Sequence, residues 1–286
     1  MADEYILTLS CADRPGLVAA VATCLASNGG NILEAQQFDA RAESRFFMRV
    51  VFALMPHAPA IDAVRASFAE VAGLNAMTWT LRPAHERRRV LILVSKFDHC
   101  LADLLYRARI GELAMDVVGV VSNHPRASFG AATLDQVPFH YLPVTPATRA
   151  EQEAATKRIV AESGAELVVL ARYMQVLSDD LARHLAGWCI NIHHSFLPGF
   201  RGAKPYHQAH ARGVKMIGAT AHYVTAELDE GPIIAQDVEP ITHADSPESL
   251  IRKGRDIERR VLARAVALHL QDRVLLNGGR TVVFQD

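Results

Sequence analysis

The stretch CINIHHSFLP, from Cys189 to Pro198, combines a short apolar strand with the polar loop that follows it. Asn191 and His193 lie two residues apart, so a strand places the amide and the imidazole on the same side. Pro198 and Gly199 then end the strand in a loop. In parallel α/β sheets, ligands bind at the carboxyl ends of the strands. This stretch therefore predicts a ligand site at the end of a buried strand.

A second β-rich run, Ala219 to Val224, precedes the sequence LDEGPII at residues 228–234 and supplies a carboxylate, Asp229. An amide, an imidazole and a carboxylate together can polarise a carbonyl, stabilise the oxyanion that forms and move a proton. With Asn191 and His193, Asp229 therefore indicates acyl-group chemistry.

Upstream of this stretch, short Val/Ile/Leu-rich strands alternate with helices. The expected strands are Val90–Val94, Val117–Val121, Phe139–Val144 and Leu167–Leu170, and the expected helices are Leu101–Arg109, Ala147–Ser163 and Asp179–Ala186. Such alternation is typical of a mostly parallel sheet covered on both faces. We expect a Rossmann-like α/β domain that ends in a long helix, Pro247–Gln271, and a hairpin around Asn277 to Gly279.

The first part of the chain has a different pattern. Its expected strands are Glu4–Cys11, Asn31–Asp39, Arg45–Leu54 and Met77–Leu81, and its helices follow Asp13 and span Ala60–Ala72. This β-α-β-β-α-β order is that of a ferredoxin-like unit. The sequence thus predicts an N-terminal domain at 1–83, a charged linker at 84–88 and a second domain at 89–286.

Composition restricts the partners. The formal net charge is −1, which argues against a nucleic acid or an acidic membrane as the main partner. No apolar run reaches the length of a membrane span, and the first residues lack the pattern of a signal peptide. The four cysteines are scattered, as expected of reduced thiols rather than disulfides. We expect a cytoplasmic protein.

The segments NIHHSFLPGFRGAKPYHQA, GATAHYV and DEGPII resemble the formyltransferase family that uses 10-formyltetrahydrofolate. The resemblance implies that Asn191, His193 and Asp229 are catalytic and that Ser195 and His222 support them. It implies no metal and no bound cofactor, because the folate is the substrate. By residue type alone, His193, His222 and Asp229 could instead hold a metal. Alternation along the strand places His194 on the opposite face, so we expect it to be structural.

The segment LARYMQVLS resembles the family's pterin-binding loop. The resemblance implies that one segment supplies backbone hydrogen bonds and an apolar slot, and that a second loop closes the other side. The folate-binding residues would be Arg172, Tyr173, Met174, Gln175, Val176, Leu177, Thr225 and Leu228. A methionine and two aliphatic residues at this spacing would also suit an ordinary core.

The segment DRPGLVAAVATCLASNGGNI resembles the start of an ACT domain, a module that often binds amino acids and often pairs between subunits. The resemblance implies an amino-acid effector site at Asp13, Gly16, Asn28 and Asn31. Asp13 and Gly16 would equally begin an ordinary helix. Pairing of an open sheet edge between copies predicts a homo-oligomer.

The loop Ser95–Cys100 lacks the glycines with which family members that act on a phosphorylated ribonucleotide cradle phosphate. Phe97 is bulky there, and Asp98 would repel a phosphate. With SKFDHCLADLL, the SNH of residues 122–124 and the ACT-like segment, the chain resembles formyltetrahydrofolate deformylases over nearly its entire length. The resemblance implies that water is the acceptor and that formate and tetrahydrofolate are released into one-carbon and purine metabolism.

Three readings stay open at this point: hydrolysis, formyl transfer to an amine, and amino-acid sensing by a chain whose enzyme domain has decayed. Intact Asn191, His193 and Asp229 argue against decay. The sequence leaves open whether His193 or Asp229 is the formal base.

Overall fold

The computed structural model describes residues 3–130, 134, 136–199 and 205–285. The chain forms two compact units. The first contains Met1–Glu86, Gln271–Leu275 and Val282–Asp286, and the second contains Arg87–Leu270 and Leu276–Thr281.

The first unit has the predicted β-α-β-β-α-β order. Its elements are β1 (Glu4–Ala12), α1 (Leu17–Ser27), β2 (Gly30–Ala40), β3 (Arg45–Leu54), α2 (Ile61–Leu74) and β4 (Thr78–Pro83). The strands form one antiparallel sheet in the order β2-β3-β1-β4. Alternate residues of β1 and β3, such as Leu7 and Val50, pack with Val21 of α1 and Phe68 of α2 into one core. The ferredoxin-like prediction is confirmed.

Two C-terminal stretches, Gln271–Leu275 and Val282–Asp286, belong to this first unit, whereas Leu276–Thr281 between them belong to the second. The predicted hairpin forms as β12 (Val274–Asn277) and β13 (Arg280–Val283). Val282 and Phe284 are buried against Ala40 and Phe47 in a small core of their own. The prediction that 89–286 forms a single second domain therefore differs from the structure in these last residues, because their apolar side chains are buried against the first sheet.

The second unit is built on a seven-stranded sheet with the order β11-β10-β9-β8-β5-β6-β7. The strands are β5 (Arg88–Val94), β6 (Met115–Ser122), β7 (Phe139–Tyr141), β8 (Leu167–Leu170), β9 (Cys189–His193), β10 (Met216–Tyr223) and β11 (Ile233–Pro240). The pairs among β5 to β9 are parallel, whereas β10 is antiparallel to both β9 and β11. The prediction of a mostly parallel sheet is confirmed, although the sequence did not identify β11.

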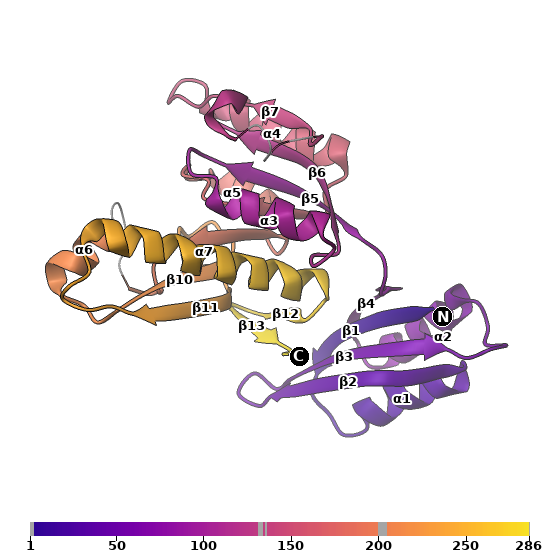
Figure 1. Ribbon diagram of the computed structural model, residues 1–286. Helices are drawn as coiled ribbons and strands as arrows, with labels where there is room; N and C mark the ends of the chain where they lie inside the picture. Colours follow the sequence, from indigo (N-terminus) through magenta and orange to yellow (C-terminus); the bar gives the residue numbers. More distant parts are fainter. Residues whose placement is uncertain (1–2, 131–133, 135, 200–204, 286) are drawn as a thin grey trace. The chain divides into compact units, whose positions relative to one another are not determined.

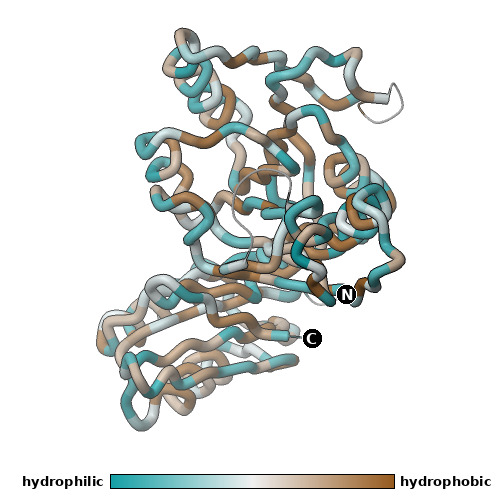
Figure 2. Tube along the Cα trace, turned by 90° about the vertical axis from the view of Figure 1, so that its left-hand side faces the viewer, coloured by the Kyte–Doolittle hydropathy of each residue, from teal (hydrophilic) through white to brown (hydrophobic). Residues whose placement is uncertain are grey.

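Helices cover both faces of this sheet (Figure 1). They are α3 (His99–Arg109), the 3-10 turn Arg126–Ser128, α4 (Arg149–Ser163), α5 (Asp179–His184), α6 (Pro205–Arg212) and α7 (Pro247–Leu270). Lys204, which precedes α6 in the sequence, lies outside the described residues. The central strands consist largely of buried apolar residues, and Figure 2 colours the whole trace by the hydropathy of each residue. None of the helices in the described ranges is long and apolar enough to cross a membrane.

The carboxyl ends of β5, β6 and β8 are joined by one serine. Ser95, directly after β5, donates from its hydroxyl to Asn123 Oδ1 at 2.7 Å. The same hydroxyl accepts from the Met174 backbone N–H at 2.9 Å. The chain reverses its strand order around β5, which is the point where open α/β sheets bind ligands. The fold thus fixes the loop after β8 beside the end of β9.

Candidate active site

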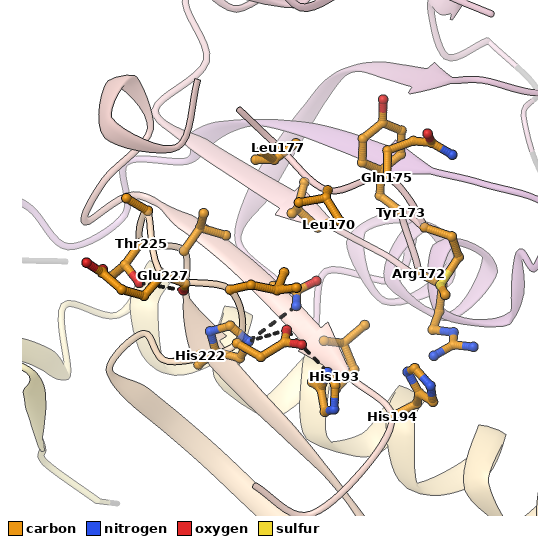
Figure 3. A pocket seen from close by; sticks show the side chains of 18 residues that line it. Leu170, Arg172, Tyr173, Gln175, Leu177, His193, His194, His222, Thr225 and Glu227 are labelled. Atoms are coloured by element: carbon orange, nitrogen blue, oxygen red, sulfur yellow. Dashed lines mark hydrogen bonds and ion pairs between the residues drawn. The ribbon is translucent and has the colours of Figure 1, made fainter. Parts of the chain in front are cut away.

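A cavity of about 270 Å³ opens at the ends of β8, β9 and β10. Eighteen residues line it, and Figure 3 shows their side chains. Among them are all three predicted catalytic residues, His222 and every predicted folate-binding residue: Asn191, His193, Asp229, Arg172, Tyr173, Met174, Gln175, Val176, Leu177, Thr225 and Leu228. The structure therefore brings together side chains from three separate parts of the sequence: residues 170–177, 191–194 and 222–229.

Asn191 and His222 are direct cross-strand partners in β9 and β10. His222 Nδ1 lies 2.9 Å from the Tyr223 carbonyl oxygen, which can only accept, so Nδ1 carries the proton. In the neutral ring Nε2 then accepts, and it lies 3.2 Å from Asn191 Nδ2. This contact fixes the orientation of the Asn191 amide, which keeps a second N–H for a substrate carbonyl.

Asp229 lies beside the imidazoles of both His193 and His222. Its Oδ1 lies 3.2 Å from His193 Nδ1 and 3.7 Å from His222 Nε2. Burial favours the neutral acid, but the His193 hydrogen bond, followed by the nearby His222 side chain, outweighs it and holds the pKa of Asp229 well below its usual range. Figure 3 marks interactions of the His193 and His222 side chains with dashed lines. Asp229 is therefore an anion that orients His193 and stabilises its imidazolium form.

His193 presents its second nitrogen for chemistry. Because Asp229 accepts from Nδ1, the neutral ring has its lone pair on Nε2. In the part of the chain that the structure describes, Nε2 is buried and has no hydrogen-bond partner. A buried, unpaired imidazole nitrogen in a cavity is able to exchange a proton with a bound reactant.

The loop that carries Asp229 depends on a close approach at Gly231. A Cβ atom there would lie 1.7 Å from the Tyr223 carbonyl oxygen and 3.1 Å from His222 Nδ1. Asp229 itself has a φ of 58°, in the left-handed region that aspartate tolerates better than most residues. The sequence DEGP thus lets the loop fold back tightly onto the end of β10.

Ser195 does not lie among the described residues that line this cavity. It is buried, and its carbonyl accepts from Thr220 Oγ1 at 2.9 Å. Thr220 Oγ1 also accepts from the Leu197 backbone N–H at 3.0 Å and from Gln236 Nε2 at 2.9 Å. The loop after β9 is therefore fastened to β10 and β11 through Thr220 and Gln236, two residues that sequence reasoning did not single out.

The predicted folate loop forms an apolar wall. Met174, Val176 and Leu228 are 53%, 56% and 61% exposed, although all three line the cavity. Large apolar side chains exposed around a cavity are typical of a site that an apolar ligand covers. Tyr173 is buried behind them and accepts from Gln152 Nε2 at 2.9 Å, and burial raises its pKa to about 12. Their exposure shows that Met174 and Val176 are not part of an ordinary core. The folate-binding role of this loop stays a prediction.

The prediction that His194 lies on the opposite face of the strand from His193 was wrong. The residue lines the cavity and does not point away from it. Its ring centroid lies 5.1 Å from that of His193. Burial, followed by the charges of Arg172 and His193, lowers the pKa of His194 to about 4. A neutral imidazole therefore stands between Arg172 and the catalytic ring at physiological pH.

The four candidate effector residues do not meet within one chain. Asp13 and Gly16 precede α1, whereas Asn28 and Asn31 follow it, and an 11-residue helix is about 16 Å long. Gly16 has a φ of 93° at the start of α1. The Asn28 side chain donates to the Cys24 carbonyl at 2.8 Å and to Ser67 Oγ at 3.0 Å, which joins α1 to α2. A site that uses both ends of α1 would need a second copy of the chain.

Comparison with known proteins gives the family. The Formyl transferase family model matches residues 88–266, and the ACT domain model matches residues 5–66. The chain is 50% identical to "Formyltetrahydrofolate deformylase" of Corynebacterium sp. (strain P-1), over 99% of this chain and 98% of the relative. The crystal structure of formyltetrahydrofolate deformylase from Burkholderia mallei ATCC 23344 matches with a TM-score of 0.93 and 52% identity, covering 99% of this chain and 100% of that chain.

A transferase structure matches only part of the chain. Glycinamide ribonucleotide transformylase 1 from Symbiobacterium toebii is 31% identical with a TM-score of 0.65, and the match covers 70% of this chain and 95% of that chain. The deformylases instead match both units, including the ACT domain. The chain belongs to the formyltetrahydrofolate deformylases, within the Formyl transferase family.

Proposed function

We infer that this protein hydrolyses 10-formyltetrahydrofolate to formate and tetrahydrofolate. The observation that carries this inference is the cavity in which Asn191, His193 and Asp229 converge, in a chain that matches deformylases over both of its units. It supports a reaction in which one carbonyl is polarised and one proton is moved.

In this mechanism the formyl oxygen accepts from the free N–H of Asn191, and His193 Nε2 takes a proton from the attacking water. The resulting imidazolium, held by Asp229 at 3.2 Å, stabilises the tetrahedral oxyanion. A C–O bond forms, the bond between the formyl carbon and N10 breaks, and the imidazolium proton passes to N10. The second water proton is released when formic acid ionises.

The folate ring system would occupy the apolar side of the cavity, between the loop Arg172–Leu177 and the residues Thr225 and Leu228. The backbone groups of the first loop are held by Ser95 and by Arg149, whose Nη2 donates to the Val176 carbonyl at 2.6 Å. A rigid, apolar slot of this kind suits a planar pterin. The reaction then needs water and the folate, without a metal or a resident cofactor.

Water as the acceptor is supported by the loop between β5 and α3. Phe97 is exposed there and Arg255 lies over its ring, with 5.5 Å between the guanidinium carbon and the ring centroid. An aromatic ring and Asp98 occupy the place where a phosphorylated acceptor would need backbone N–H groups. We propose a cytoplasmic protein on the basis of its free, buried cysteines.

The first unit is proposed to bind an amino-acid effector and to pair with a second copy. The geometry of Asp13 and Asn28 at opposite ends of α1 supports a site shared between copies. The edge strand β2 carries exposed Leu33 and Phe38, which supports pairing through that edge.

The test is turnover of 10-formyltetrahydrofolate by purified protein without any amine, with formate and tetrahydrofolate followed together. We expect equal release of both products. His193→Ala and Asp229→Ala should lower turnover by about a hundredfold or more while leaving the thermal midpoint nearly unchanged. Release that begins only after an amine is added would identify a transferase and contradict the proposal.

A further inference from the structure

A second cavity, of about 260 Å³, adjoins the catalytic one. The two share three lining residues, Arg172, Met174 and His194, so these side chains lie at the boundary between the two cavities. The rest of the second cavity is largely apolar, with Phe97 and Ile251 in its wall. The folate site described above does not use this space.

A buried carboxylate, Glu258 of α7, anchors the polar side of this cavity. It is 1% exposed, and its oxygens lie 2.8 Å from His99 Nε2, 2.7 Å from Tyr206 Oη and 3.3 Å from Arg172 Nε. Burial raises its pKa, but His99, the Arg172 charge and Tyr206 together outweigh this and lower it. Glu258 is therefore ionised, and it contacts side chains from α3, from α6 and from the loop after β8.

The packing of α7 makes this arrangement specific. A Cβ atom on Gly254 would lie 2.1 Å from the ring of Tyr206, so only glycine lets that ring lie against the helix. Tyr206 then reaches Glu258 with its hydroxyl. Gly254 lies one helical turn before Glu258, so the sequence of α7 supplies both the space for Tyr206 and the carboxylate to which it donates.

Arg172 is only partly satisfied by this cluster. Its side chain is 10% exposed, yet within the described part of the chain its Nε and Nη1 have no hydrogen-bond partner, and Glu258 meets it only as an ion pair at 3.3 Å. A guanidinium offers five donors, and a buried one without partners is costly unless a ligand uses them. Figure 3 shows this side chain extending from its loop toward His194.

The charges around the cavity favour an anion. Arg172 and Arg255 each bring one positive charge, and Glu258 brings one negative charge, which leaves an excess of one positive charge among these three. His99, Cys100 and Glu258 offer atoms within 4.8 Å of one another, as metal ligands would. However, burial and Glu258 raise the pKa of the Cys100 thiol well above its usual value, so Cys100 is not the thiolate that a metal would need. A cation is therefore disfavoured.

We propose that the second cavity is a product subsite in which Arg172, positioned by Glu258, binds the carboxylate of formate. The inference rests on the proposed hydrolysis, which creates this small anion in the neighbouring cavity. The guanidinium can pair with both carboxylate oxygens, and His194, which is neutral, brings no second charge beside it. The apolar wall excludes water and strengthens the pairing.

The test is a titration of the folded protein with ¹³C-formate, followed by NMR line broadening, which needs no turnover. Formamide serves as the neutral ligand of the same size, and sodium chloride as the ionic-strength control. The double variant Arg172→Met/Glu258→Gln removes both buried charges together, so that neither is left without its partner. Arg172→Lys keeps the positive charge but lacks the planar guanidinium that pairs with both carboxylate oxygens. Arg109→Met, outside both cavities, is the matched control.

We expect formate to bind the parent protein and the Arg109→Met control equally. The double variant should bind it about tenfold more weakly or worse, and Arg172→Lys should fall between them. Inhibition of turnover by added formate should weaken in the same order. Equal formate affinity in the parent and the double variant, or formamide binding as tight as formate, would overturn the subsite. A protein that binds formate but does not hydrolyse the folate would instead refute the proposed function alone.

Discussion

His222 acts on the reaction through Asn191. Its Nδ1 is committed to the Tyr223 carbonyl, and its Nε2 holds the Asn191 amide at 3.2 Å. An amide without this partner can rotate by half a turn and present its oxygen to the substrate carbonyl. The imidazole therefore determines which end of Asn191 faces the formyl group.

Two substitutions at this position separate orientation from packing. His222→Leu removes the acceptor and should lower kcat by about ten- to a hundredfold, with a smaller change in KM. His222→Gln keeps a carbonyl oxygen that accepts from Asn191 and should retain more of kcat. Steady-state kinetics of both variants check this, and equal kcat in the two would mean that the contact does not orient Asn191.

His194 makes stability depend on pH. Its pKa is lowered from 6.5 to about 4, so between these values the folded state binds fewer protons than the unfolded chain. The free energy of unfolding should be unaffected above pH 6.5 and should decline from there toward pH 4, by up to about 3 kcal/mol from this residue.

Urea unfolding of the parent and of His194→Gln over pH 4–7 measures this contribution as the difference between the two curves. The parent should lose more stability than the variant as the pH falls. Parallel curves would show that His194 is not held neutral by Arg172 and its buried surroundings.

The strand pattern was sufficient to predict that Asn191 and His193 share a face. The same pattern gave the wrong side for the next residue, His194. Alternation holds only while a strand continues, and β9 ends at His193. His194 already belongs to the loop, so its side chain turns toward the cavity. The contact between Arg172 and Glu258 could not be predicted either, because it depends on how α7 packs against α6 and the loop after β8.

The turn between β10 and β11 positions the catalytic carboxylate. Gly231→Ala would place a Cβ atom 1.7 Å from the Tyr223 carbonyl oxygen, so the loop carrying Asp229 must move. We expect a loss of stability of about 1–3 kcal/mol and a fall in kcat of at least about tenfold. Denaturant unfolding and kinetics measure the two effects.

Gly73→Ala is the matched control, because a Cβ atom at that helical position meets nothing within 4 Å. It should leave kcat unchanged and stabilise α2 slightly. Retention of full activity by Gly231→Ala would contradict the close approach of this turn to His222.

The central strands were predictable because parallel strands buried on both faces consist of continuous apolar runs. Strand β11 could not be predicted in this way, because it lies at the edge of the described sheet beside β10 and carries Gln236, Asp237 and Glu239. Its alternation is interrupted by a register shift at Ala221/His222 in the partner strand. Edge strands with polar residues lack the pattern on which such predictions rely.

At the scale of the whole molecule, the last residues belong to the first unit. Arg273 Nη1 lies 3.2 Å from Glu34 Oε1, Arg82 pairs with Asp272, and Phe284 is buried beside Phe47. The chain leaves its first unit after Glu86 and returns to it at Gln271. No composition shift marks that return, because the hairpin sequence suits either unit.

Phe284→Ala should therefore destabilise the first unit by about 3 kcal/mol, through the lost burial and the space left beside Phe47. Hydrogen exchange of β2 and β3 amides measures the effect locally. Leu74→Ala, at a position in the same unit that is 80% exposed, should change stability by less than about 0.5 kcal/mol. Unchanged exchange in Phe284→Ala would contradict the assignment of the C-terminal residues to this unit.

The central claim is that water attacks the formyl carbon in the cavity of Asn191, His193 and Asp229. The most direct measurement is turnover of 10-formyltetrahydrofolate in ¹⁸O-labelled water without an amine, followed by mass spectrometry of the released formate. The mechanism predicts one labelled oxygen in each formate from the parent protein, and a rate reduced by about a hundredfold or more in His193→Ala. Unlabelled formate, or labelled formate at the same rate from His193→Ala, would contradict it.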